Sequence, residues 1–113
     1  MNLEAVEQDI IRQITNANGI VVLLRERRFD GAKYQPLRDS IIKYGELIKD
    51  ETMINKQVAG CLWTLESALV DAVVVFNREH IRTVEAESIG KAHAEIWDLL
   101  NDIFSMNNLM IEE

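Results

Sequence analysis

The sequence contains few residues that cross-link or interrupt a chain. It has one cysteine, one proline and five glycines among 113 residues, and no two glycines are adjacent. A single cysteine excludes an internal disulfide, and a chain of this length buries roughly 60–70% of its unfolded surface without one. Isolated glycines exclude a glycine-rich phosphate loop. The scarcity of breakers favours long regular elements in a single domain, residues 1–113, with Cys61 as a small buried hydrophobe.

Targeting and membrane-spanning segments are also lacking. The first ten residues carry Glu4, Glu7 and Asp9 and no basic residue, which excludes the basic start of a secretory leader. The longest run without a charge, residues 13–24, is shorter than the ~20 residues that a membrane span needs. We therefore expect a cytoplasmic protein with no membrane partner.

Positive charge is in short supply. There are 12 basic against 19 acidic residues, a net charge of −7, and this balance disfavours nucleic acid as a partner. Residues 25–39 form a local exception with an excess of basic side chains. The predicted contacts to an anion or an acidic partner protein are Arg25, Arg27, Arg28 and Lys33. The alternative is that the arginines stabilise the negative end of a helix dipole.

Residues 58–76 carry apolar side chains on more than one side of a predicted helix. One seam, spaced alternately by three and four, consists of Val58, Leu62, Leu65, Leu69, Ala72 and Phe76. A second stripe of Trp63, Val70 and Val74 lies roughly 120° or more from that seam. A helix with two apolar stripes must be covered on two sides, which predicts the centre of a helical bundle.

The last predicted helix, capped by Thr83, has the most regular pattern. Its seam contains Ile89, Ala92, Ile96, Leu99, Ile103, Met106 and Met110. A flanking strip consists of His93, Trp97, Leu100 and Phe104, and the opposite, solvated face includes Glu95 and Asp98. Because the connection between this helix and the helix over residues 58–76 is short, we expect the two to be antiparallel neighbours. We also expect close helix packing at Gly60 and Gly90.

The first half of the chain predicts two helices. Apolar spacing favours one long helix from Leu3 to about Arg28, with a weak point at Gly19, although Asn18-Gly19 is also a helix stop signal. Residues 20–24 resemble a strand in composition, but no second segment offers a pairing partner. Pro36 fits the first position of a shorter helix that extends to Ile48. The predicted fold is an all-α, antiparallel bundle of four helices, the second shorter than the rest, with no strand.

No constellation of a known catalyst or metal site is present. The Glu-x-x-His pattern of carboxylate-bridged di-iron bundles is absent, because Asn77 and Gly90 lie three residues before the two histidines. All-helical magnesium pyrophosphohydrolases use Glu-x-x-Glu and Glu-x-x-Asp, and both second positions fail after Glu46 and Glu66. A degenerate set would comprise Glu46, Glu51, Glu66 and Asp71. The simpler interpretation is that Glu66 and Asp71 lie at a partly wet boundary and pair with Arg12 or Lys43.

The sequence thus predicts a small, non-enzymatic interaction or regulatory protein that docks to a partner protein and needs no cofactor or metal. Tryptophan is enriched at protein interfaces, and both tryptophans fall on the extra strips. We therefore expect a homodimer built on Trp63, Val70, Val74, His93, Trp97, Leu100 and Phe104. Two alternatives remain open: a carboxylate-metal nucleotide hydrolase, and an acidic immunity protein that neutralises a basic toxin.

Overall fold

A computed structural model describes residues 2–104, and the described chain is 78% helical with no strand. The helices are α1 (Leu3–Thr15), α2 (Ile20–Arg25), α3 (Gly31–Ile48), α4 (Lys56–Arg78) and α5 (Val84–Ile103). The all-α bundle is confirmed. The seam residues Met106 and Met110 lie outside the described part of the chain.

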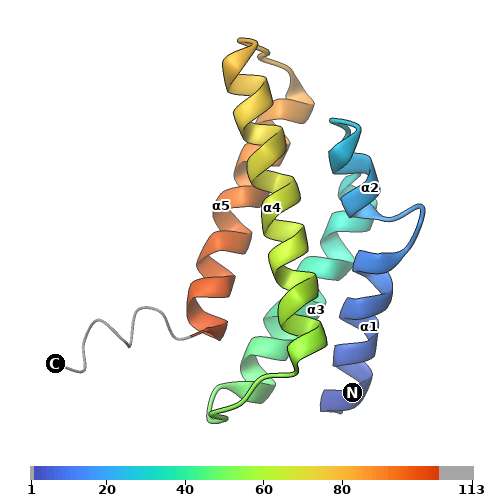
Figure 1. The fold of residues 1–113 in the computed structure, drawn as a ribbon, viewed down its shortest axis with the longest axis vertical. Coiled ribbons are helices and arrows are strands. Elements are labelled where there is room, and N and C mark those ends of the chain that lie inside the picture. Colours follow the sequence, from blue (N-terminus) through green and yellow to red (C-terminus); the bar gives the residue numbers. More distant parts are fainter. Residues whose placement is uncertain (1, 105–113) are drawn as a thin grey trace, which may run out of the picture.

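The four long helices form a ring in the order α1, α3, α5, α4, and each packs against the next. The chain runs up α1, down α3, up α4 and down α5, with the short α2 beyond the end of α1 (Figure 1). As a result, α3 and α5 run in the same direction, and α3 and α4 lie at opposite corners. The expected antiparallel pairing of α4 with α5 is confirmed and is the most extensive contact in the bundle.

Helix α4 supplies the centre of the core. Its predicted seam is confirmed, since every member is buried: Val58, Leu62, Leu65, Leu69, Ala72 and Phe76. Cys61 is buried as well, and burial raises the pKa of its thiol. Among the described helices, α4 is the one long and apolar enough to cross a membrane. The central helix of a globular protein can have the same length and composition. Here α4 contacts α1, α2 and α5, so it has the surroundings of a core helix.

The prediction of one continuous helix from Leu3 to Arg28 is wrong. Helix α1 ends at Thr15, and Asn16 adopts an extended conformation. The Oδ1 of Asn16 accepts a hydrogen bond from the Asn18 amide at 2.8 Å. The chain then approaches itself so closely that a Cβ at Gly19 would lie 2.7 Å from the Gln13 carbonyl oxygen. Glycine is therefore required at this position. The strand alternative for residues 20–24 is wrong too, because they form α2.

Pro36 does not begin a helix as predicted. Helix α3 begins earlier, at Gly31, because the Asp30 carboxylate accepts a hydrogen bond from the Ala32 amide and caps the first turn. Pro36 lies inside the helix, where it removes one backbone donor. The buried side of α3 consists of Tyr34, Leu37, Ile41, Tyr44 and Ile48.

Both ends of the α4–α5 connection follow from local hydrogen bonding. The His80 amide donates to the Asn77 carbonyl, the Ile81 amide donates to the Phe76 carbonyl, and His80 has a φ of 57°. This is a Schellman motif with histidine at the position that usually holds glycine. Thr83 caps α5 as predicted, since its hydroxyl accepts from the Ala86 amide. The tight connection holds the outer faces of α4 and α5 side by side.

Candidate functional site

Large apolar side chains are exposed on the outer face of α4 and α5. Trp63 is 53% exposed, Trp97 48%, Val74 44% and Val70 37%. The Trp63 ring stacks on Phe104, with ring centroids 5.9 Å apart and an interplanar angle of 18°. We call this surface the tryptophan face and define it as Trp63, Val70, Val74, Trp97 and Phe104. The structure thus places five of the seven predicted interface residues on one side of the bundle.

Leu100 corrects the prediction for α5. It was expected on the outer strip but is 3% exposed, whereas Leu99, expected in the seam, is only partly buried. A straight helix drifts by ~20° per heptad relative to a strict 3.5-residue repeat. The buried series therefore continues from Ile96 to Leu100, and Leu100 cannot contact a second molecule.

The seventh predicted residue, His93, covers a buried carboxylate. Glu66 of α4 is 3% exposed, and its Oε1 lies 2.8 Å from Nε2 of His93 on α5. Apart from this contact, no donor within residues 2–104 reaches either Glu66 oxygen. Burial raises the pKa of the Glu66 carboxyl, and the nearby imidazole opposes this rise only in part. An ionisable pair thus lies directly beneath the α4–α5 face.

The expected partners of Glu66 were wrong. Arg12 pairs with Asp9 on α1, and Lys43 lies 4.0 Å from Glu46 on α3. Glu66 points instead between α4 and α5, where His93 is the nearest base. Helical spacing alone could not identify this pair, because the two residues are brought together by the register of two helices.

Two of the predicted partner-binding arginines lie beside the tryptophan face. Arg25 and Arg27 line a hollow of about 280 Å³ between α2 and α4, together with Trp63, Thr64, Ser67, Ala68 and Asp71. The basic segment and the Trp63 stripe, which lie far apart in the sequence, therefore meet on one surface.

The four basic side chains differ in how they are engaged. Arg27 has a φ of 62°, and its guanidinium donates to the carbonyls of Leu24 and Arg25 at 3.3 and 3.2 Å. Arg28 pairs with Glu26 at 3.4 Å, and Lys33 donates to the Asn18 carbonyl at 2.7 Å. Within residues 2–104, Arg25 forms no ion pair or side-chain hydrogen bond. Arg25 is thus the cation of this set most available to a partner.

Sequence reasoning missed a polar link between α3 and α5. The Tyr34 hydroxyl donates to Glu95 at 2.5 Å, and Arg38 approaches the other Glu95 oxygen at 3.3 Å. Burial and the adjacent carboxylate both raise the pKa of Tyr34. Glu95 was expected to be solvated, and no local pattern indicated otherwise. The link fixes the register of α3 against α5.

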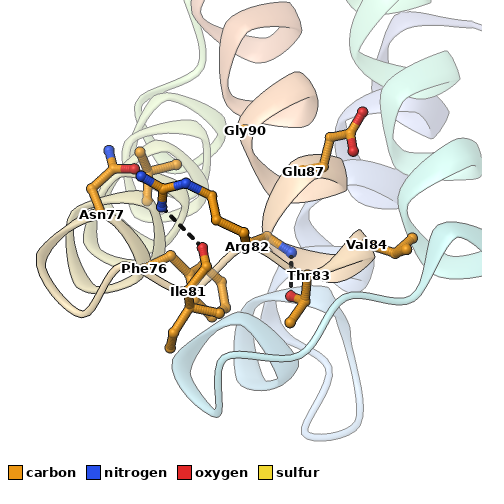
Figure 2. A pocket seen from close by; sticks show the side chains of 10 residues that line it. Phe76, Asn77, Ile81, Arg82, Thr83, Val84, Glu87 and Gly90 are labelled. Atoms are coloured by element: carbon orange, nitrogen blue, oxygen red, sulfur yellow. Dashed lines mark hydrogen bonds between the residues drawn. The ribbon is translucent and has the colours of Figure 1, made fainter.

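A hollow of about 540 Å³ lies at the α4–α5 connection. Figure 2 shows Arg82 extending past Ile81 toward Asn77, and Arg82 donates to the Ile81 carbonyl at 3.2 Å. Thr83 uses its hydroxyl to cap α5. The hollow thus has two ionisable lining side chains, Arg82 and Glu87, and neither histidine nor cysteine lines it. This lining offers no pair suited to acid–base catalysis.

The carboxylates of the hydrolase alternative do not converge. Glu46 and Glu51 lie in a groove near the end of α3, Glu66 lies between α4 and α5, and Asp71 faces the hollow below α2. Within the described residues, no group of three or more histidine, cysteine or carboxylate side chains could hold a metal ion. The geometry therefore offers nothing in favour of that alternative.

No known protein family, curated protein or solved structure matches this chain.

Proposed function

We propose that this protein is a small, non-enzymatic interaction protein of the cytoplasm that works by docking through its tryptophan face. The observation that carries the proposal is the exposure of Trp63 and Trp97, each about half accessible, on adjacent helices. Tryptophan is enriched among the residues that contribute most to binding, and large exposed apolar patches mark interaction sites.

A second copy of this chain is the occupant that the surface chemistry favours. Each copy carries a net charge of −7, so two copies repel each other over most of their surfaces. The five residues of the tryptophan face are all uncharged, and Glu66 beneath them is buried. Two acidic copies that meet through this face would bring none of its own side chains into like-charge contact. A two-fold arrangement would place each face against its counterpart.

The hollow lined by Arg25 and Arg27 extends this surface toward a further partner. Arg25 lies next to Trp63 and has no ion pair within the described chain, so its guanidinium is available to a carboxylate of another protein. A homodimer that presents Arg25 at the edge of its interface would serve as a small regulatory adaptor.

Gel filtration with light scattering tests the homodimer. At tens of micromolar we expect a mass near twice 13.0 kDa, and we expect Trp63→Ala and Trp97→Ala to shift it toward the monomer. Truncating an interface tryptophan removes the side chain that buries the most apolar area. Val84→Ala is the matched control, because Val84 is 81% exposed but lies outside the tryptophan face. A wild-type mass near 13.0 kDa would contradict the homodimer.

A further inference from the structure

A groove with an apolar floor lies on a different side of the molecule, between α3 and α5. It measures about 410 Å³, and its floor includes Ile42 and Gly45 of α3 and Leu99 and Ile103 of α5. Leu99 and Trp97 point about 160° apart around α5, given about 100° per residue. The groove itself therefore shares no lining residue with the tryptophan face.

Gly45 keeps this groove open. A Cβ at position 45 would lie 3.4 Å from Cγ1 of Ile103 and 3.9 Å from its Cδ1, which is ordinary contact. No glycine with a described conformation has a positive φ, so the backbone does not require glycine at this position. Glycine in a helix costs about 1 kcal/mol relative to alanine. What this glycine provides is space between α3 and α5.

The apolar surface continues toward the α3–α4 connection. A neighbouring hollow of about 340 Å³ shares Ile48, Glu51 and Ile103 with the groove and adds Met53 and Phe104, so it reaches the edge of the tryptophan face. Met53 is 85% exposed. Exposed methionine is typical of surfaces that accept apolar side chains of varied shape. Apolar side chains are thus accessible from Ile42 at one end to Met53 at the other.

The rim of the groove is acidic. Its charged side chains are Glu46, Glu51 and Asp102 against a single cation, Lys49. Within residues 2–104, neither Glu51 nor Asp102 has an ion-pair partner. Glu46 forms a long, exposed ion pair with Lys43, at 4.0 Å. An apolar floor between unpaired carboxylates complements a ligand that is apolar on one side and basic on the other.

We propose that the α3–α5 groove binds a basic amphipathic helix of a partner protein. Its apolar side chains, at spacings of three and four, would occupy the floor between Ile42 and Ile103, as helices do in other hydrophobic grooves. Its lysines or arginines would face the carboxylates of Glu51 and Asp102. The proposal goes beyond self-association through the tryptophan face and does not depend on it.

The probe is a synthetic, fluorescein-labelled helix with leucine at helical spacing and lysine at the other positions, and the measurement is fluorescence anisotropy. We expect saturable binding to the full chain. The triple variant Glu46→Gln, Glu51→Gln, Asp102→Asn should weaken binding by about tenfold or more. The control Glu4→Gln, Glu79→Gln, Glu87→Gln removes the same charge elsewhere and should change affinity by less than about twofold. Equal losses in the two triple variants would mean non-specific attraction to an acidic protein and would overturn the proposal.

Two further variants test the floor. Gly45→Leu adds a side chain to the floor of the groove, so binding should be lost, and urea unfolding checks that the variant remains folded. Ile42→Lys places a cation at a 36% exposed position of the floor and should also abolish binding. Unchanged binding in both variants contradicts the proposal.

The same variants identify other occupants. If Gly45→Leu lowers the mass in gel filtration, a second copy fills the groove and the proposal is wrong. If Gly45→Leu and Leu109→Lys destabilise the full chain equally, the chain's own residues 105–113 compete for the groove, and the proposal is again wrong. The dimer and the groove fail separately, because Trp97→Ala should leave peptide binding unchanged.

Discussion

Glu66 illustrates what a single buried charge does to this fold. A carboxylate with 3% exposure is removed from water, and among residues 2–104 its one close basic neighbour is His93 at 2.8 Å. Pairing with one partner seldom offsets the full cost of desolvating an ion. The net result is a raised pKa, so the folded protein holds this proton more tightly than the unfolded chain does.

The raised pKa predicts how stability depends on pH. The contribution of Glu66 is fully present below the ordinary carboxyl pKa and is lost as the pH rises through the raised value. Glu66→Gln has no such proton, so its stability relative to wild type should improve as the pH rises through this range. Urea unfolding at a series of pH values measures the difference. Glu79→Gln, at an exposed position, is the control and should remain parallel to wild type. A parallel curve for Glu66→Gln would show that the carboxyl is not perturbed.

At the scale of the element, the break between α1 and α2 depends on one residue. A Cβ at Gly19 would lie 2.7 Å from the Gln13 carbonyl oxygen, whereas a Cβ at Gly60 meets none of the described residues within 4 Å. The expectation of close helix packing at Gly60 and Gly90 was wrong, because an added Cβ at either position would meet none of the described residues within 4 Å. The two classes of glycine therefore respond to alanine in opposite directions.

Gly19→Ala should lower the free energy of unfolding by about 1–3 kcal/mol, because the new methyl group forces the backbone apart. Gly60→Ala should raise it by about 0.5–1 kcal/mol, since alanine is the better helix former. Chemical denaturation of both variants measures the pair. A stabilised Gly19→Ala would indicate that the chain between α1 and α2 can straighten into one helix.

The helices could be predicted because their apolar periodicity is long and regular, as in the α4 seam from Val58 to Phe76. The break after Thr15 was signalled by Asn18-Gly19 but outweighed by the apolar spacing that continues through Ala17 and Val21. The interactions that decide it are a side-chain hydrogen bond and a steric contact, which spacing does not show. Leu100 was misplaced because a heptad pattern drifts over three turns. Trp63 and Trp97 could be assigned to the surface from spacing, whereas the Glu66–His93 pair needs the register of two helices.

At the scale of the whole molecule, charge and apolar surface are segregated. The chain carries a net charge of −7, while the five residues of the tryptophan face are uncharged and the α3–α5 groove has an apolar floor with an acidic rim. Binding at the first surface should be opposed by long-range repulsion, and binding at the second should be assisted by attraction to a basic partner.

Salt therefore distinguishes the two surfaces. Raising the salt concentration shortens the Debye length from about 10 Å at 0.1 M to about 3 Å at 1 M. The homodimer should tighten severalfold, because repulsion between the two acidic copies is screened. Sedimentation at several salt concentrations measures this, with Trp97→Ala as a control that stays monomeric. A dimer that weakens with salt would mean that ion pairs, and not the uncharged face, hold the copies together.

The shortness of α2 has a consequence for motion. Six residues are too few to be stable as an isolated helix, so Ile20–Arg25 persists only while Ile20, Val21 and Leu24 stay packed against their neighbours. Its amide protons should then exchange through a local opening that leaves α4 and α5 protected. Each opening would carry Arg25 away from Trp63.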